Sequence, residues 1–193
     1  MTVRSTWNLT GDPALLDDFA RRPIEYEVRM LLQQFGHFER CWRDVQKRRS
    51  RNPDADLGAD GQALLEAVLV HLRLLDEFLG DPRQAERRRK ADQDDVFARH
   101  WDRRRHPRWE PRRFLGNADR QGVNAKLVHL TGRRLTRPDV QPNDITPLVR
   151  KCCERLKEFF DHVDQHNNAR VAAFACPRRR AEQFLSGDPK AVA

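Results

Sequence analysis

A nearly continuous apolar run, QALLEAVLVHLRLLDEFL, extends from Gln62 to Leu79. At about 100° per residue, a set of apolar residues shares one helical face with His71. These residues are Leu64, Ala67, Val68, Leu75 and Phe78. Glu66, Arg73 and Glu77 gather on another face. The run therefore predicts a largely buried helix that carries a lone imidazole in its core-facing stripe.

Three other segments repeat apolar residues every three or four positions, which is typical of amphipathic helices. The first runs from Ile24 to about Arg49, and Pro23 is expected to separate it from a short preceding helix. A second is expected from Pro111 to about Thr131. The last long helix is expected to begin at the N-cap Asp144 and to reach at least Val163.

No repeat and no alternating strand pattern of useful length occurs, so the sequence predicts an all-α protein. We expect a single antiparallel helical bundle of four to five main helices with charged connecting loops, among them the acidic turn from Asn52 to Gly61. The length of 193 residues suits one domain. Residues 1–168 are expected to form this domain and residues 169–193 a weakly structured C-terminal tail. The core is expected in four stretches: Ile24 to Val45, Leu64 to Leu79, Val123 to Leu130 and Ile145 to Val163.

The net charge of +8 favours acidic partners such as nucleic acid. Only six of the 37 basic residues are lysines, and such an arginine excess also arises from a GC-rich genome. Both explanations stay open. The N-terminal sequence MTVRSTWNLTGDP lacks the apolar stretch of a secretory signal, and the run from Gln62 to Leu79 carries five ionisable groups, too many for an ordinary membrane span. We therefore expect a cytoplasmic protein.

His71 is the first candidate catalytic residue. A desolvated imidazole has a defined tautomer, which suits catalysis or ligand binding. The alternative is a core histidine that is hydrogen-bonded to a carbonyl or a side chain. Arg73 lies one turn before Glu77 and two turns after Glu66, so the three are expected to pair along one ridge, and a salt bridge inside the bundle is the favoured use.

The segment GVNAKLVHLTGRR, from Gly122 to Arg134, holds the second candidate site. Lys126, His129 and Arg133 are expected on one side of a helix, opposite its apolar stripe. Two nearby cations keep an imidazole neutral near pH 7, as a general base requires, so His129 and Arg133 are candidate catalytic residues. The same three side chains equally suit a solvated basic face.

The segment from Ala98 to Arg113, ARHWDRRRHPRWEPRR, is the candidate nucleic-acid contact. Between Arg99 and Arg113 it holds seven arginines against two acids. Guanidinium groups neutralise phosphates and indoles stack on unpaired bases, so the segment suits single-stranded RNA or DNA. The residues expected to bind are Trp101, Arg103, Arg104, Arg105 and Trp109, together with Lys126. The alternative is that the tryptophans anchor a loop onto the bundle.

No metal and no cofactor are expected. Asp92, Asp94 and Asp95, followed by His100, match no known calcium or zinc spacing, and His162 and His166 lack a third ligand. The four cysteines have no C-x-x-C spacing and are expected to be reduced structural thiols. They are Cys41, Cys152, Cys153 and Cys176.

The motifs LLEAVLVHLRLLDEFL, DDVFARHW and VNAKLVHLTGRR together loosely resemble uncharacterised bacterial all-helical proteins of the HEPN superfamily, over roughly Glu25 to Arg134. The resemblance implies an antiparallel, often dimeric bundle. It also implies a metal-independent ribonuclease of a defence or stress system, marked by R-x(4 to 6)-H. This chain has Asn124 where that arginine is wanted before His129. Literal matches from Arg99 to His106 and from Arg155 to His162 are expected by chance in an arginine-rich chain.

Two hypotheses of function follow. The first is an HEPN-like, RNA-associated protein, either a ribonuclease with His129 as its base or a non-cleaving relative. The second is a non-enzymatic helical module that dimerises or binds another helical protein, with His71, Arg73 and Glu77 as structural polar groups. A membrane partner is not expected.

Overall fold

The computed structural model describes residues 18–80, 98, 109–128, 142–166 and 172–188. Over these ranges the protein is all-α, with five α-helices and no strand. The helices are α2 (Glu25–Arg49), α3 (Gly58–Leu79), α5 (Asn117–Val128), α7 (Pro142–His166) and α8 (Ala175–Leu185), and α2 is preceded by the π-helix η1 (Ala20–Ile24). The predicted fold class, an all-α helical bundle, is confirmed.

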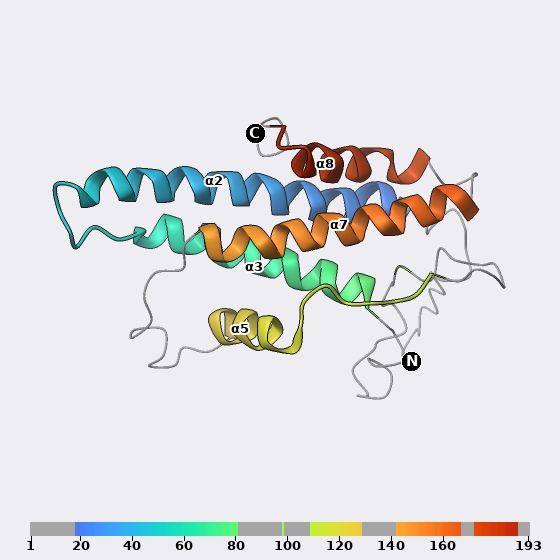
Figure 1. The fold of residues 1–193 in the computed structure, drawn as a ribbon, viewed down its shortest axis with the longest axis horizontal. Helices are drawn as coiled ribbons and strands as arrows, with labels where there is room; N and C mark the ends of the chain where they lie inside the picture. Colours follow the sequence, from blue (N-terminus) through green and yellow to red (C-terminus); the bar gives the residue numbers. More distant parts are fainter. Residues whose placement is uncertain (1–17, 81–97, 99–108, 129–141, 167–171, 189–193) are drawn as a thin grey trace, which may run out of the picture.

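The long helices α2, α3 and α7 lie side by side (Figure 1). Both α3 and α7 run antiparallel to α2, and α8 lies across α2 and α7 and runs in the direction of α2 (Figure 1). Helix α5 packs on α3 at the opposite side of the molecule. This order leaves one side of α3 away from α7 and α8, which positions the candidate site described below.

The core is built from the predicted apolar faces. Every apolar position predicted to repeat along α2 is buried. These positions are Ile24, Val28, Leu31, Leu32, Phe35, Phe38, Trp42 and Val45. Phe159 of α7 is the centre of an aromatic cluster, with the rings of Phe78, Trp109 and Phe174 at 5.5, 5.4 and 5.3 Å between centroids. Edge-on packing of this kind stabilises a core beyond the area that it buries.

Several helix boundaries differ from the expected ones. Pro23 does not end a helix but lies inside η1, so the helical course continues through it into α2. Helix α3 begins at Gly58, within the expected acidic turn, and the carboxylate of Asp56 accepts the Gly58 N–H at 3.0 Å. Helix α7 begins at Pro142 instead of Asp144, since proline suits the first turn of a helix.

The C-terminal segment also differs from the weakly structured tail expected over residues 169–193. It contains α8, whose residue Ala181 is buried, and Phe174 just before it is buried as well. A helix of this length is marginal alone, so contacts with the bundle must stabilise it. Arg178 makes ion pairs with Asp161 and Asp164 of α7. These ion pairs join residues of different helices, and the periodicity within one helix does not predict such contacts.

None of the helices in the described ranges combines the length and the apolar character that crossing a bilayer requires.

Candidate functional site

His71 lies between α2 and α3 and is hydrogen-bonded to a carboxylate. Its Nδ1 is 2.6 Å from Oε2 of Glu27, and the residue is only 9% exposed. Because an ionised carboxylate only accepts hydrogen bonds, Nδ1 donates to it, which fixes the orientation of the ring. The Tyr26 ring meets the imidazole edge-on, with 6.2 Å between centroids. This is the hydrogen-bonded core histidine that the sequence offered as the alternative to a catalytic one.

Three large apolar side chains that neighbour this pair in the sequence are exposed. Tyr26, Val70 and Leu74 are 45%, 42% and 43% exposed, although large apolar side chains elsewhere in the described residues are mostly buried. Val70 and Leu74 are one turn apart on α3, on either side of His71 in sequence, and Tyr26 projects from α2. We call these three residues the α2–α3 face. Exposed apolar residues that cluster in this way are typical of contact surfaces.

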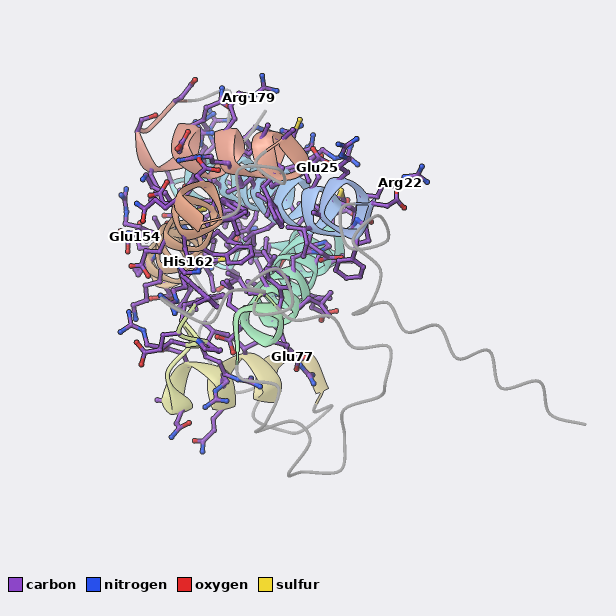
Figure 2. The ribbon with its side chains drawn as sticks, turned by 90° about the vertical axis from the view of Figure 1, so that its right-hand side faces the viewer. Arg22, Glu25, Glu77, Glu154, His162 and Arg179 are labelled. Atoms are coloured by element: carbon purple, nitrogen blue, oxygen red, sulfur yellow. The ribbon has the colours of Figure 1, made fainter. Side chains whose placement is uncertain are left out.

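Arg73 and Glu77 form the predicted ion pair, with Nε and Oε1 at 3.0 Å. The pair does not lie inside the bundle, because both side chains are almost half exposed. Figure 2 shows Glu77 on α3, on the side of the molecule where α5 packs. An exposed pair at this spacing contributes little to stability, so Arg73 and Glu77 belong to the surface.

Asp76 is a buried carboxylate that the sequence analysis did not single out. It is 1% exposed and accepts the Leu115 N–H at 2.9 Å and an Arg113 guanidinium N–H at 3.3 Å. Burial raises the pKa of Asp76, against the lowering effect of the Leu115 N–H and the Arg113 charge. These contacts hold Arg113 and Leu115 against α3, within the irregular segment 109–116. Helix α5 follows this segment and begins at Asn117, not at Pro111 as expected. The sequence does contain a signal for the burial of Asp76, because this residue lies one turn after Leu72, on the buried side of the helix.

Trp109 lies inside the bundle and is 7% exposed. The Arg155 guanidinium lies over its ring, 4.1 Å from the centroid. Arg155 also donates to the backbone carbonyls of Arg112 and Glu110 and pairs with Glu158. The indole is therefore not presented to solvent as a surface for base stacking, in agreement with the alternative that this tryptophan anchors a loop onto the bundle.

The R-x(4 to 6)-H match from Arg155 to His162 lies on α7, and both of these residues lie near the Trp109 ring. The His162 ring lies 5.7 Å from the Trp109 ring, between centroids. The guanidinium of Arg155 is already held by two carbonyls and a carboxylate, so its donors are engaged within the fold.

The neighbouring cysteines of α7, Cys152 and Cys153, are buried and free. Burial raises the pKa of Cys153 to about 12 and that of Cys152 well above its ordinary value. A thiol acts as a nucleophile only as its thiolate, so these two cysteines are structural. Cys41 and Cys176 are free as well.

Most of the other predicted site residues lie outside the described part of the chain. These are His129, Arg133, Trp101, Arg103, Arg104 and Arg105. Lys126 lies within α5, but its side chain is not among those described. His71 and Trp109 are the described candidates, and they pack against different sides of the bundle: His71 against α2, and Trp109 against α7.

Comparison with protein families, with characterised proteins and with solved structures finds no match for this chain.

Proposed function

We propose that the protein is a non-enzymatic helical module that forms a homodimer through the α2–α3 face. The observation that carries the proposal is the exposure of Val70 and Leu74 beside Tyr26, on a side of α3 that the other described helices leave open. Apolar side chains that are half exposed on a rigid helix lose little conformational entropy on binding, so their burial favours association.

The outer side of α3 has the spacing of a coiled-coil seam. Ala63, Ala67, Val70 and Leu74 are separated by four, three and four residues, which places them on one line of the helix. Ala63 is exposed and Ala67 half-buried. In an antiparallel pairing of two α3 helices, Val70 meets Ala67 of the second copy and Leu74 meets Ala63. Large residues thus pack against small ones across a two-fold axis.

The charges beside this seam are self-complementary. Glu66 and Arg73 occupy equivalent flanking positions of successive heptads, and such positions face each other in an antiparallel pair. In the register set by Val70, Glu66 of one copy lies beside Arg73 of the other, and the two-fold axis repeats the contact. Charge complementarity of this kind fixes register more than it adds affinity. It favours a second copy of this chain over an unrelated partner.

The ribonuclease hypothesis stays a prediction. It depends on His129 and Arg133, which lie outside the described residues. The other proposed catalytic residue, His71, bonds to Glu27 and packs on the Tyr26 ring, and these contacts favour a structural role.

Sedimentation velocity over a range of concentrations tests the proposal. The monomer mass is 22.7 kDa, and we expect a concentration-dependent shift to twice that mass. A single-helix seam is small for an interface, so the dissociation constant should be on the order of 1–100 μM. A monomer at all concentrations up to about 500 μM, well above that range, would sink the proposal.

Variants then locate the interface. Val70→Glu with Leu74→Glu should give a monomer, whereas Gln46→Glu with Gln121→Glu, which makes the same charge change at other exposed positions, should still dimerise. Glu66→Arg and Arg73→Glu should each weaken the dimer, and the two together should restore it. Circular dichroism checks that each variant is folded. Equal loss of dimer in the control, or no restoration in the double swap, contradicts this interface and register.

A further inference from the structure

A second surface lies on the other half of α2. Four cations line one side of the helix and the turn that follows it, spaced by three, four and four residues. They are Arg40, Arg43, Lys47 and Arg51, and all four are exposed. The N–H groups of Arg51 and Asn52 donate to the Arg48 carbonyl, so the helical course continues past the end of α2 and keeps Arg51 in the row. We call this row the α2 basic ridge.

The fold makes little use of these four charges. Lys47 Nζ is 3.4 Å from Asp44 Oδ1, but both side chains are more than two-thirds exposed. Arg43 Nε donates to the backbone carbonyl of Glu39 at 3.5 Å. Within the described residues, Arg40 and Arg51 have no ion pair within 4.0 Å. Burial raises the pKa of the Glu39 carboxylate, and the charges of Arg43 and Arg40 lower it to a smaller extent. Contacts this exposed are weak, so the ridge cations are available to an anion.

Arg48 and Arg49 lie between Lys47 and Arg51 and differ from the ridge cations, because both donate hydrogen bonds within the fold. Arg48 donates to the Asp56 carbonyl at 3.2 Å, and Arg49 donates to the Ala55 carbonyl at 2.7 Å. Arg49 also lies over the Trp42 ring, 5.3 Å from its centroid. These two side chains hold the turn between α2 and α3, whereas the ridge cations around them do not.

We infer that the α2 basic ridge binds the phosphodiester backbone of a nucleic-acid duplex without reading its sequence. Cations that recur about once per helical turn neutralise successive phosphates and release the counterions condensed on them. From Arg40 to Arg51 the row is about 16 Å long, at 1.5 Å per residue. That length matches about five base-pair steps of a duplex.

Within the described residues, no exposed Phe, Tyr or Trp ring lies beside the ridge, and this favours a duplex over a single strand. Proteins that bind single strands stack bases on exposed aromatic rings beside the charged groove. On α2, Phe35, Phe38 and Trp42 are buried, and the exposed Tyr26 lies near the other end of the helix from the ridge. A cationic row without such rings contacts phosphates alone, which positions a duplex but does not read its sequence. This inference does not depend on the proposed dimer, since the α2–α3 face shares no residue with the ridge.

Fluorescence anisotropy with a labelled 20-base-pair RNA duplex and a DNA duplex of the same sequence, a probe length of about four such ridge footprints, tests the inference. For the DNA duplex, the logarithm of the association constant should fall against the logarithm of salt concentration with a slope of about −3 to −4. Arg40→Gln with Arg43→Gln should reduce that slope by about 2 and weaken binding about tenfold or more at low salt.

The matched control is Arg150→Gln with Arg179→Gln, which removes the same charge from exposed positions on α7 and α8. Arg179 extends away from the bundle on the outer side of α8 (Figure 2). The control and the Val70→Glu, Leu74→Glu variant should both keep the wild-type slope. Binding of both duplexes supports backbone recognition, and a preference for one identifies the natural source.

Three results would overturn the inference. One is no binding of either duplex at about 50 mM salt, where phosphate contacts are strong. Another is an equal loss of binding in the control variant, which would assign the effect to net charge. The third is equal affinity for polyglutamate at matched charge, which would make the ridge a surface for acidic polypeptides.

Discussion

Two polar contacts of α3 differ sharply in what they do, although they lie only five positions apart. His71 bonds to Glu27 and so joins two helices that already pack along their apolar faces. Asp76 accepts hydrogen bonds from Leu115 and Arg113, and holds a segment that has no helical hydrogen bonds of its own. A buried polar group therefore contributes most to stability where apolar packing and backbone hydrogen bonds contribute least.

Their surroundings differ as well. His71 lies under a surface that carries exposed apolar side chains, while Asp76 lies beneath a chain segment and is almost inaccessible. Replacing His71 can therefore admit water beside the remaining carboxylate, but replacing Asp76 leaves a backbone N–H and an arginine without their acceptor inside the protein.

The largest effect is expected for Asp76→Ala. Removing the acceptor leaves the Leu115 N–H and the Arg113 guanidinium unsatisfied, so the free energy of unfolding should fall by about 3 kcal/mol or more. Urea unfolding followed by circular dichroism measures it. Asp76→Asn keeps an oxygen acceptor for Leu115 and should lose less. If the alanine variant loses under about 1 kcal/mol, the carboxylate does not hold this segment.

A smaller effect is expected for the pair of His71 and Glu27. In a double-mutant cycle with alanine at each position, we expect a coupling free energy of about 1–2 kcal/mol, since the hydrogen bond is short but lies near the surface. The measurement is urea unfolding of the wild type, both single variants and the double variant. A coupling as large as the whole loss in Asp76→Ala would remove the contrast between the two contacts.

The free energy of unfolding should depend on pH through the buried carboxylate of Asp76. Burial raises the pKa of Asp76 above its ordinary value of 3.8, so the native state binds this proton more tightly than the unfolded state does. Proton binding to Asp76 therefore stabilises the native state. This contribution to the free energy of unfolding is fully present below pH 3.8 and is lost as the pH rises through the raised pKa.

The free energy of unfolding of the wild type, minus that of Asp76→Asn, should therefore fall as the pH rises through this window. Urea titrations of both proteins in one buffer series give this difference. The contributions of the other carboxylates are the same in both proteins and cancel. A difference that rises with pH would mean that the Arg113 charge outweighs burial.

The smallest effect is expected for the surface pair of Arg73 and Glu77. Both side chains are almost half exposed, so Glu77→Ala should change the free energy of unfolding by less than about 0.5 kcal/mol. Thermal unfolding at low and at high salt measures it, and the difference should shrink at high salt. A loss of more than about 1 kcal/mol would place this pair with the buried contacts instead.

Much of the fold could be predicted, because helical periodicity is a local property. The apolar positions predicted for α2 are all buried, and so are most of those predicted for α7. The spacing of residues along one helix decides which of them share a face, whatever the partner is. For the same reason, the burial of His71 follows from its place in the apolar run of α3.

Less of the candidate site could be predicted. The exposure of Val70 and Leu74 depends on which sides of α3 the other helices cover. The sequence of α3 alone does not indicate which sides these are. Asp76 lies among leucines at a buried register, but its role depends on Leu115 and Arg113, 39 and 37 residues further along the chain. Sequence alone showed a polar group in a core stripe and not its partner.

The all-α class, the apolar faces of α2, α3 and α7 and the burial of His71 follow from the sequence, because each depends on residues within a few turns of one another. Only the tertiary structure decided that Glu27 is the partner of His71, that Trp109 lies under Arg155 and that α8 packs on the bundle. Those contacts join residues 44, 46 and up to 155 positions apart, as the pairs His71 with Glu27, Trp109 with Arg155 and Arg180 with Glu25 show. Their formation depends on how whole helices pack, since closing such long loops is unfavourable until many contacts form together.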